Sequence, residues 1–162
     1  MTDEKNLPDK AKQAPRVSRC NISAVKKAAR RLSLLYDTVL APTGLKSTQY
    51  GILSALNSRG AALPTVGELA EELVMDRSTL GQNLRPLERD QLVRLLTDPK
   101  DRRSRLIALT QQGIAKVNEA AKYWRIAQDC FETTFGKQEA AELRSVLHAI
   151  AHNEKLTNRG ND

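Results

Sequence analysis

The chain has 162 residues, of which 40% are hydrophobic and 28% are charged, a composition typical of a globular domain that excludes wholesale disorder. Its 26 basic side chains outnumber the 19 acidic ones, and the net charge of +7 favours a polyanionic partner, nucleic acid before an anionic membrane surface. No apolar run approaches the roughly 18 residues of a membrane span, and two distant cysteines cannot form a disulfide framework, so we expect a cytoplasmic protein with no membrane partner.

The N-terminal third of the chain is predicted to be helical after a polar start. Residues 1–20 show no apolar periodicity and carry an excess of basic side chains, which predicts a flexible basic tail. From about 21 to 41 apolar residues recur every three or four positions, as in an amphipathic helix, and Pro42 ends this pattern. Ser47 is the expected N-cap of a second helix, which ends before Gly60.

The middle of the chain predicts two short helices followed by a β-hairpin. Residues 65–68 fit a capping box that begins the first helix, and Asp76 is the expected cap of the second. The second helix carries leucines at helical spacing on one face: Leu80, Leu84 and Leu87. Further along, the apolar period becomes that of a strand, so 93–97 and 105–109 are predicted to form a hairpin with a charged tip.

The C-terminal part predicts two more helices. A long helix is expected from Thr110 to about Phe135, where Gly136 ends it, and a last helix extends to about residue 157. Apolar residues of the long helix keep a near-heptad spacing: Ile114, Val117, Ala121, Trp124 and Phe131. We interpret this stripe as core or dimer surface and expect no cofactor there, with any effector pocket lying where the stripe meets the first helix.

Two helices joined by a tight turn and followed by a hairpin with a basic tip predict a winged helix–turn–helix. The second helix offers polar side chains to base edges in the major groove, and the hairpin reaches the DNA backbone or the adjacent minor groove. The candidate DNA-binding residues on the helix are Arg77, Ser78, Thr79, Gln82, Asn83 and Arg85, and those on the hairpin are Lys100, Arg102, Arg103 and Arg105. Asp101 is interpreted as a wing-positioning residue that pairs with Arg103, or alternatively as a turn former.

Several segments resemble the MarR family of bacterial winged helix–turn–helix transcription regulators. They are TVGELAEEL at 65–73, DRSTL at 76–80 and the wing segment DPKDRRSRLIALTQQG at 98–113. The resemblance covers about residues 22–156 and implies an obligate homodimer that binds an inverted-repeat operator in double-stranded DNA. It also implies an effector, often a small aromatic acid or an oxidant, that lowers the affinity for DNA.

The predicted fold class is mainly α with a small β-hairpin wing. We expect a single domain over 21–162. The winged helix–turn–helix lies at about 47–109, and dimerisation helices flank it at about 21–41 and 110–157.

Three residues of the second motif helix and its end depart from the expected pattern. Gly81 lies inside the helix, where glycine costs about 0.8–1.0 kcal/mol relative to alanine; its missing side chain permits close approach of DNA or another helix, unless it is simply tolerated. Pro86 is expected to kink the helix. Gln91 stands where the family commonly has a glycine, so it must take the left-handed conformation at a steric cost, or the turn differs.

Four further side chains are candidates for functional groups. Cys20 is a candidate redox sensor, because in some members of the family a cysteine near this point senses peroxide; the alternative is an inert thiol. Cys130, on the apolar long helix, is interpreted as core. His148 and His152 have a spacing that can chelate a metal, but two ligands alone favour a surface or dimer-contact role, and no metal site is predicted.

The expected function is a sequence-specific DNA-binding repressor that a small-molecule effector, an aromatic acid or a thioester, releases from its operator. A redox-sensing repressor that uses Cys20 stays open as an alternative. So does a winged-helix interaction module without sequence-specific DNA binding. The sequence shows no paired carboxylates, nucleophile motif or phosphate-binding glycine loop, so an enzyme is not expected.

Overall fold

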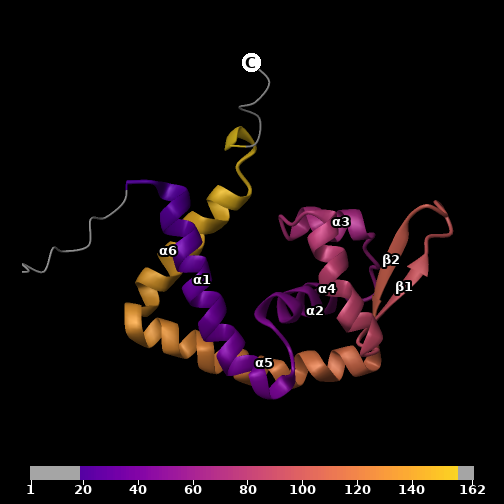
Figure 1. The fold of residues 1–162 in the computed structure, drawn as a ribbon, viewed down its shortest axis with the longest axis horizontal. Coiled ribbons are helices and arrows are strands. Elements are labelled where there is room, and N and C mark those ends of the chain that lie inside the picture. The colour runs from indigo at the N-terminus through magenta and orange to yellow at the C-terminus, as the bar shows by residue number, and fades with distance from the viewer. Residues whose placement is uncertain (1–18, 157–162) are drawn as a thin grey trace, which may run out of the picture. The chain divides into compact units, whose positions relative to one another are not determined.

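The computed structural model describes residues 19–156. These residues contain six α-helices, one antiparallel hairpin and two short 3-10 turns (Figure 1). The elements are α1 (Asn21–Leu40), η1 (Ala41–Thr43), α2 (Ser47–Ser58), α3 (Val66–Glu72), α4 (Arg77–Arg89), β1 (Val93–Thr97), β2 (Arg105–Leu109), α5 (Gln111–Phe135), α6 (Lys137–Ala151) and η2 (Glu154–Leu156). The predicted fold class, mainly α with a small β-hairpin wing, is confirmed.

The chain divides into two units, Met1–Leu32 and Ser33–Asp162. The division falls inside α1, the first of the predicted dimerisation helices. Of the predicted basic tail, residues 1–18 lie outside the described residues. The helix–turn–helix, the hairpin and the two C-terminal helices all belong to the second unit.

The core of the second unit is formed by aliphatic side chains from α2, α3, α4 and the hairpin. Its fully buried members include Ile52, Leu53, Leu69, Leu80, Leu84, Leu87, Val93 and Ile107. Burial of one such side chain contributes about 1.5–3 kcal/mol. The short helices α3 and α4 are therefore held in place by packing, since helices of this length are marginal on propensity alone.

The hairpin is hydrogen-bonded to the loop that precedes α3. The strands β1 and β2 pair antiparallel at the predicted positions. The N–H of Ile107 donates to the carbonyl of Pro64 at 2.9 Å, and Thr65 forms an isolated antiparallel bridge with Leu106. The base of the wing and the start of the helix–turn–helix consequently form one hydrogen-bonded structure.

Side-chain caps begin α3 and α5 where the sequence predicts them. Thr65 Oγ1 accepts the N–H of Glu68 at 3.1 Å, and the Glu68 carboxylate accepts the N–H of Thr65 at 2.7 Å. Thr110 Oγ1 likewise accepts the N–H of Gly113 at 2.9 Å. These bonds satisfy amides that have no partner inside their own helix.

The prediction that Ser47 caps α2 is wrong, because the N-cap is Lys46 and Ser47 is the first helical residue. The N–H of Ser47 donates instead to Asp37 Oδ1 of α1 at 2.7 Å. Burial alone would raise the pKa of Asp37, but the hydrogen bonds from Ser47 and the charge of Lys46 outweigh it and hold the pKa below its ordinary value. The cap is thus supplied by a carboxylate from another helix.

The helices α3 and α4 both end with a non-glycine residue in the left-handed conformation. After α4, Gln91 has a φ of 58°, and the N–H of Leu92 closes a Schellman motif on the carbonyl of Leu87 at 2.8 Å. After α3, Val74 has a φ of 50°. The conformation expected for Gln91 is confirmed, whereas that of Val74, a β-branched residue with a larger steric cost, was not anticipated.

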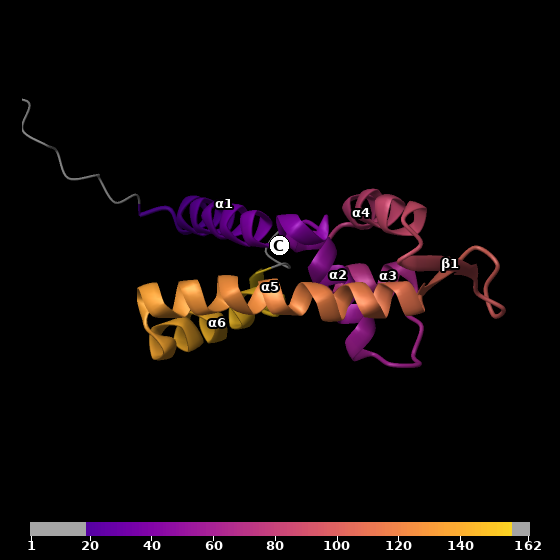
Figure 2. The ribbon, with the colours of Figure 1, turned by 90° about the horizontal axis from the view of Figure 1, so that it is seen from below.

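The helix α5 joins the winged helix–turn–helix to the C-terminal helix. It packs against α2 and η1, and Lys116 Nζ donates to the carbonyl of Thr43 at 3.3 Å. The chain then turns at Gly136, where φ is 96°, into α6, which contacts α5 (Figure 2).

Candidate nucleic-acid interface

The helix α4 has one face in the core and the opposite face in solvent. Leu80, Leu84 and Leu87 are buried at helical spacing. The exposed face carries Arg77, Ser78, Gln82 and Arg85 of the predicted DNA-binding set. A helix of this kind fits the major groove of B-DNA, where such side chains meet base edges.

Asp76 organises the first turn of α4. Its carboxylate accepts the N–H of Thr79 at 2.8 Å, the hydroxyl of Ser78 at 2.5 Å and the hydroxyl of Thr79. These bonds hold the pKa of the Asp76 carboxyl far below its ordinary value. The two hydroxyls donate their hydrogens to Asp76. In the free protein, the lone pairs that remain on Ser78 and Thr79 can therefore only accept hydrogen bonds.

The amides on α4 differ in how far they are available for DNA. Asn83 is half-buried, and its Nδ2 donates back to the carbonyl of Thr79 at 2.9 Å. Gln82 is exposed. Glutamine and asparagine side chains can both bind adenine; of these two residues Gln82 is the better placed, because Asn83 must break an intrahelical bond before it can donate to a base.

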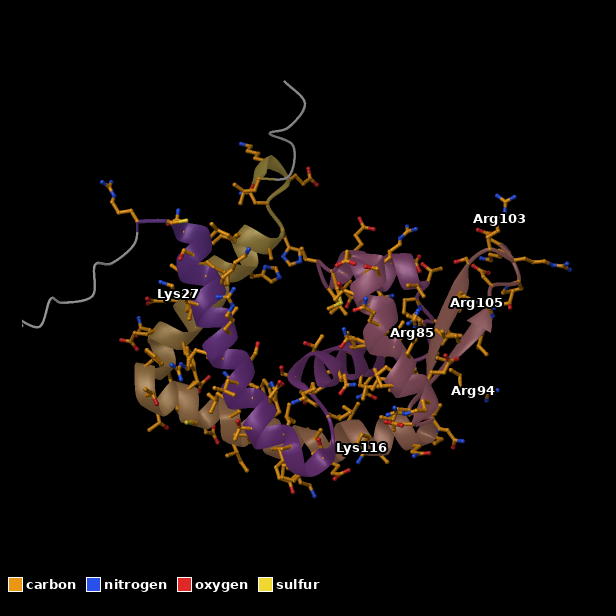
Figure 3. All side chains as sticks on the ribbon, in the orientation of Figure 1. Lys27, Arg85, Arg94, Arg103, Arg105 and Lys116 are labelled. Atoms are coloured by element: carbon orange, nitrogen blue, oxygen red, sulfur yellow. The ribbon has the colours of Figure 1, made fainter. Side chains whose placement is uncertain are left out.

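The wing tip is shaped by two carboxylates. Asp98 Oδ1 accepts the N–H of Lys100 at 2.8 Å, and Asp101 Oδ1 accepts the N–H of Arg103 at 3.0 Å. Asp101 therefore contacts the backbone of Arg103, and among residues 19–156 it forms no ion pair with that guanidinium. If Asp101 positions Arg103, it does so by shaping the turn of the backbone. The Arg103 side chain itself extends from the tip of the wing (Figure 3).

The candidate cations of this surface have no carboxylate partner among the described residues. Within 19–156, the basic side chains that form ion pairs are Lys46, Arg59, Arg89, Lys116 and Arg144. The predicted DNA-binding cations are not among them: Arg77, Arg85, Lys100, Arg102, Arg103 and Arg105. Their charge is thus not neutralised within the described part of the chain, as a phosphate-binding surface requires.

One exposed cation of the wing was missed by the sequence reasoning. Arg94 follows the buried Val93 on β1 and is exposed, opposite Ala108 (Figure 3). Because side chains alternate between the two faces of a strand, the sequence places Arg94 on the face opposite the buried Val93, and this signal could have identified it. Arg105, which was predicted, donates from Nη1 to Thr97 Oγ1 across the strands at 3.2 Å.

The departures from the expected pattern on α4 have separate outcomes. The helix continues through Pro86 to Arg89, and the kink stays a prediction. No neighbouring atom of the described chain lies within 4 Å of where a Cβ of Gly81 would be. Approach of another helix in the described chain therefore does not account for this glycine, and approach of DNA stays a prediction.

The cap at Asp76 leads to a prediction about acid stability. Replacing Asp76 with alanine is expected to lower the midpoint of thermal unfolding by about 2–4 °C at pH 7, because the orphan amides of α4 lose their acceptor. Because folding lowers the pKa of Asp76, its ionised carboxylate stabilises the fold at pH values above the ordinary carboxyl pKa. This stabilisation is lost as the pH falls and the carboxylate becomes protonated. The difference between wild type and variant should therefore shrink below about pH 4.

A matched control for this prediction is Asp76→Asn, which keeps an acceptor at the cap but does not titrate. Its unfolding midpoint is expected to lie nearer to that of the wild type at pH 7. Thermal unfolding followed by circular dichroism between pH 2.5 and 7 measures both variants. A constant difference between wild type and Asp76→Ala over this range would contradict the assignment.

The remaining candidates belong to elements other than α4 and the wing. Cys20 is exposed before α1, and the interpretation of Cys130 as core is wrong, because it lies on an exposed side of α5. The rings of His148 and His152 stack with centroids 4.1 Å apart. Among residues 19–156 no three potential metal ligands cluster, and no helix has the length and apolarity of a membrane span.

Comparison with known proteins decides the family. The sequence profile of the MarR family matches residues 43–104. The HTH-type transcriptional regulator PecS of Dickeya dadantii is 30% identical over 125 residues, which cover 74% of this chain and 75% of PecS. The chain belongs to the MarR family of transcriptional regulators.

Solved structures of regulators bound to DNA share the fold of this MarR-family chain. The transcriptional regulator MosR of Mycobacterium tuberculosis in complex with DNA has a TM-score of 0.75 and 29% identity, over 86% of this chain and 98% of MosR. The repressor CouR bound to a 23-mer DNA duplex has a TM-score of 0.73 and 27% identity, over 82% of this chain and 93% of CouR.

Proposed function

We propose that this MarR-family chain is a homodimeric repressor that binds an inverted-repeat operator in double-stranded DNA and is released by a small-molecule effector. The observation that carries the proposal is the surface of α4 and the wing, where six basic side chains have no carboxylate partner among residues 19–156. That MosR and the repressor CouR, which share this fold, are bound to DNA supports the proposal. The proposed contacts are those of α4 with base edges and phosphates, and those of Lys100, Arg102 and Arg103 with phosphates.

Exposed apolar side chains on the C-terminal helices support a homodimer. Those on α5 and α6 include Ile126, Phe135, Leu143, Val146, Leu147 and Ile150. Large exposed apolar side chains that gather on two helices are typical of an interface, and a second copy of the chain would cover them. A two-fold axis would then place the two α4 helices in successive major grooves, about 34 Å apart.

A cavity between α1, α2 and α5 is the proposed effector site. It has a volume of about 410 Å³ and is lined by Tyr36, Ser47, Tyr50, Gly51, Ser54 and Trp124. The rings of Tyr50 and Trp124 lie 6.5 Å apart at 31°, so a flat ligand would meet aromatic faces beside serine hydroxyls. The site includes Trp124 of the apolar stripe and Tyr36 of the first helix, where the sequence places an effector pocket.

The lining suits a small aromatic acid or an aromatic thioester. The Tyr36 side chain is held in place by a hydrogen bond, because its hydroxyl donates to Gln128 Oε1 at 2.7 Å. Burial raises the pKa of Tyr36, and that of Tyr50 is raised for the same reason, so both phenols remain protonated at neutral pH. The hydroxyl hydrogen of Tyr36 is already given to Gln128, so Tyr50 is the neutral donor that can orient a carboxylate or carbonyl without a buried counter-charge.

The experiment that tests this function begins with in vitro selection of a duplex from random sequence by the wild-type chain. We expect binding to the selected duplex about 1,000-fold tighter than to a scrambled duplex of equal length at physiological salt. Fluorescence anisotropy titration measures both affinities. Nearly equal affinities would instead favour the alternative, a winged-helix interaction module without sequence-specific DNA binding.

The same titration identifies the effector. Aromatic acids and acyl thioesters are added in turn, and the effector is expected to weaken operator binding by about 5- to 150-fold. Linkage requires the operator duplex to weaken effector binding by the same factor. Peroxide, applied to the wild type and to Cys20→Ser, tests the redox-sensing alternative, which requires release that the serine variant does not show.

A further inference from the structure

The guanidinium of Arg77 lies against the backbone of α3 at Gly67. A Cβ built on Gly67 would lie 3.0 Å from Nη2, 3.4 Å from Cζ and 3.5 Å from Nε of Arg77. Three atoms of the planar group therefore occupy the space into which a side chain at position 67 would extend. Arg77 is the first residue of α4, so this contact joins the two helices of the helix–turn–helix through an arginine of the proposed DNA surface.

The backbone of α3 does not itself require glycine at this position. Gly67 lies inside the helix, outside the left-handed region that favours glycine, and glycine there costs about 0.8–1.0 kcal/mol relative to alanine. The contact with Arg77 is the feature of the described chain that a side chain at position 67 would disturb. Gly67 thus lowers the helix propensity of α3 but leaves space for the guanidinium of Arg77.

Arg77 has no other fixed partner in the described chain. It is exposed, and no carboxylate of residues 19–156 lies within ion-pair distance. A long exposed arginine samples many rotamers, and ordering such a side chain on binding costs about 0.5–1.5 kcal/mol. A guanidinium already laid on α3 loses less freedom when it meets a phosphate.

We propose that Gly67 is a positioning residue for DNA binding, which acts by leaving open the space beside α3 that the Arg77 guanidinium occupies and from which it meets a DNA phosphate. This inference rests on the proposed function, because it assumes that the surface of α4 binds a duplex. Gly67 itself does not touch the DNA. A methyl group at position 67 displaces the far end of a flexible side chain and leaves the fold intact.

A double-mutant cycle on the duplex selected by the wild type tests the proposal. Gly67→Ala is expected to raise the unfolding midpoint, since alanine favours the helix, and yet to weaken duplex binding about 5-fold. Arg77→Ala should weaken binding about 10-fold and reduce the slope of log affinity against log salt by about one. In the Arg77→Ala background, Gly67→Ala should have no further effect on binding, because the group that it displaces is gone.

A matched control for Gly67→Ala is Asn118→Ala on α5. Asn118 is exposed, lies inside a helix and is not among the residues proposed to bind DNA, the effector or a second copy of the chain. This variant should raise the unfolding midpoint, because alanine favours the helix more than asparagine does, and leave duplex binding unchanged. It separates the effect of helix stabilisation from that of moving Arg77.

Two results would overturn the inference while leaving the proposed function intact. One is wild-type affinity in Gly67→Ala, and the other is an equal loss from Gly67→Ala with and without Arg77. Failure of the proposed function is a different outcome, in which the wild type itself selects no duplex.

Discussion

Replacement of both Arg102 and Arg103 by alanine is expected to lower affinity for the selected operator duplex by about 100-fold. It should also reduce the slope of log affinity against log salt by about two. Both side chains are exposed at the wing tip, and neither pairs with a carboxylate among residues 19–156. Each proposed phosphate contact releases about one counterion, so the loss should be greatest at low salt.

Anisotropy titrations at several salt concentrations measure both quantities for this wing variant. The matched control is Arg59→Ala with Arg89→Ala, which removes the same charge from side chains already paired with Glu72 and Asp90. The control should leave the salt slope close to that of the wild type. An unchanged slope in the wing variant would show that the wing does not bind phosphates.

Replacement of Gly113 by alanine is expected to reduce the free energy of unfolding by about 3 kcal/mol or more. A Cβ at this position would lie 2.1 Å from the carbonyl oxygen of Leu92 and 2.7 Å from Cδ1 of Leu109. The Leu92 oxygen is a backbone atom that also accepts the N–H of Thr110 at 3.1 Å, so it cannot move without loss of that hydrogen bond. The first turn of α5 would have to separate from the hairpin.

Urea denaturation followed by circular dichroism measures this effect. Gly51→Ala on α2 serves as the stability control, because its Cβ meets open space and alanine is the better helix former. Gly113→Ala should therefore be strongly destabilised while Gly51→Ala is slightly stabilised. Equal stability of the two variants would show that the start of α5 accommodates a side chain.

The elements of this fold could be predicted from sequence because the information that defines them is local. The capping residues Thr65, Asp76 and Thr110 each act within one turn of the helix that they begin. The change of apolar period after α4 marks the hairpin in the same local way. The fold class and the family followed from such short-range patterns.

The features that could not be predicted depend on contacts between distant segments. The acceptor for Ser47 comes from Asp37 on another helix, and Gly113 is required by the carbonyl of Leu92. Neither pair has a spacing that sequence periodicity can reveal. The left-handed conformation of Val74 was missed for a different reason, since a β-branched residue is the least expected occupant of that position.

The elements that carry the candidate DNA-binding residues could be predicted from sequence, but the side-chain hydrogen bonds of those residues could not, and their contact with DNA stays a prediction. Figure 3 shows Arg85 on α4 and Arg103 and Arg105 on the hairpin, whose first strand contacts α4. The side-chain hydrogen bonds of Asn83 and Asp101 could not be foreseen, because each residue has several local partners within reach. Only the packed structure selects among them.

The division of α4 into a buried leucine face and an exposed polar face has a consequence for how regulators of this kind diversify. The leucines fix the helix in the core, while Gln82 and Arg85 contribute little to folding because they contact solvent. Substitutions at these two positions can therefore accumulate at little thermodynamic cost. Under the proposed function, new operator sequences would then become accessible by drift, with no stabilising mutation needed beforehand.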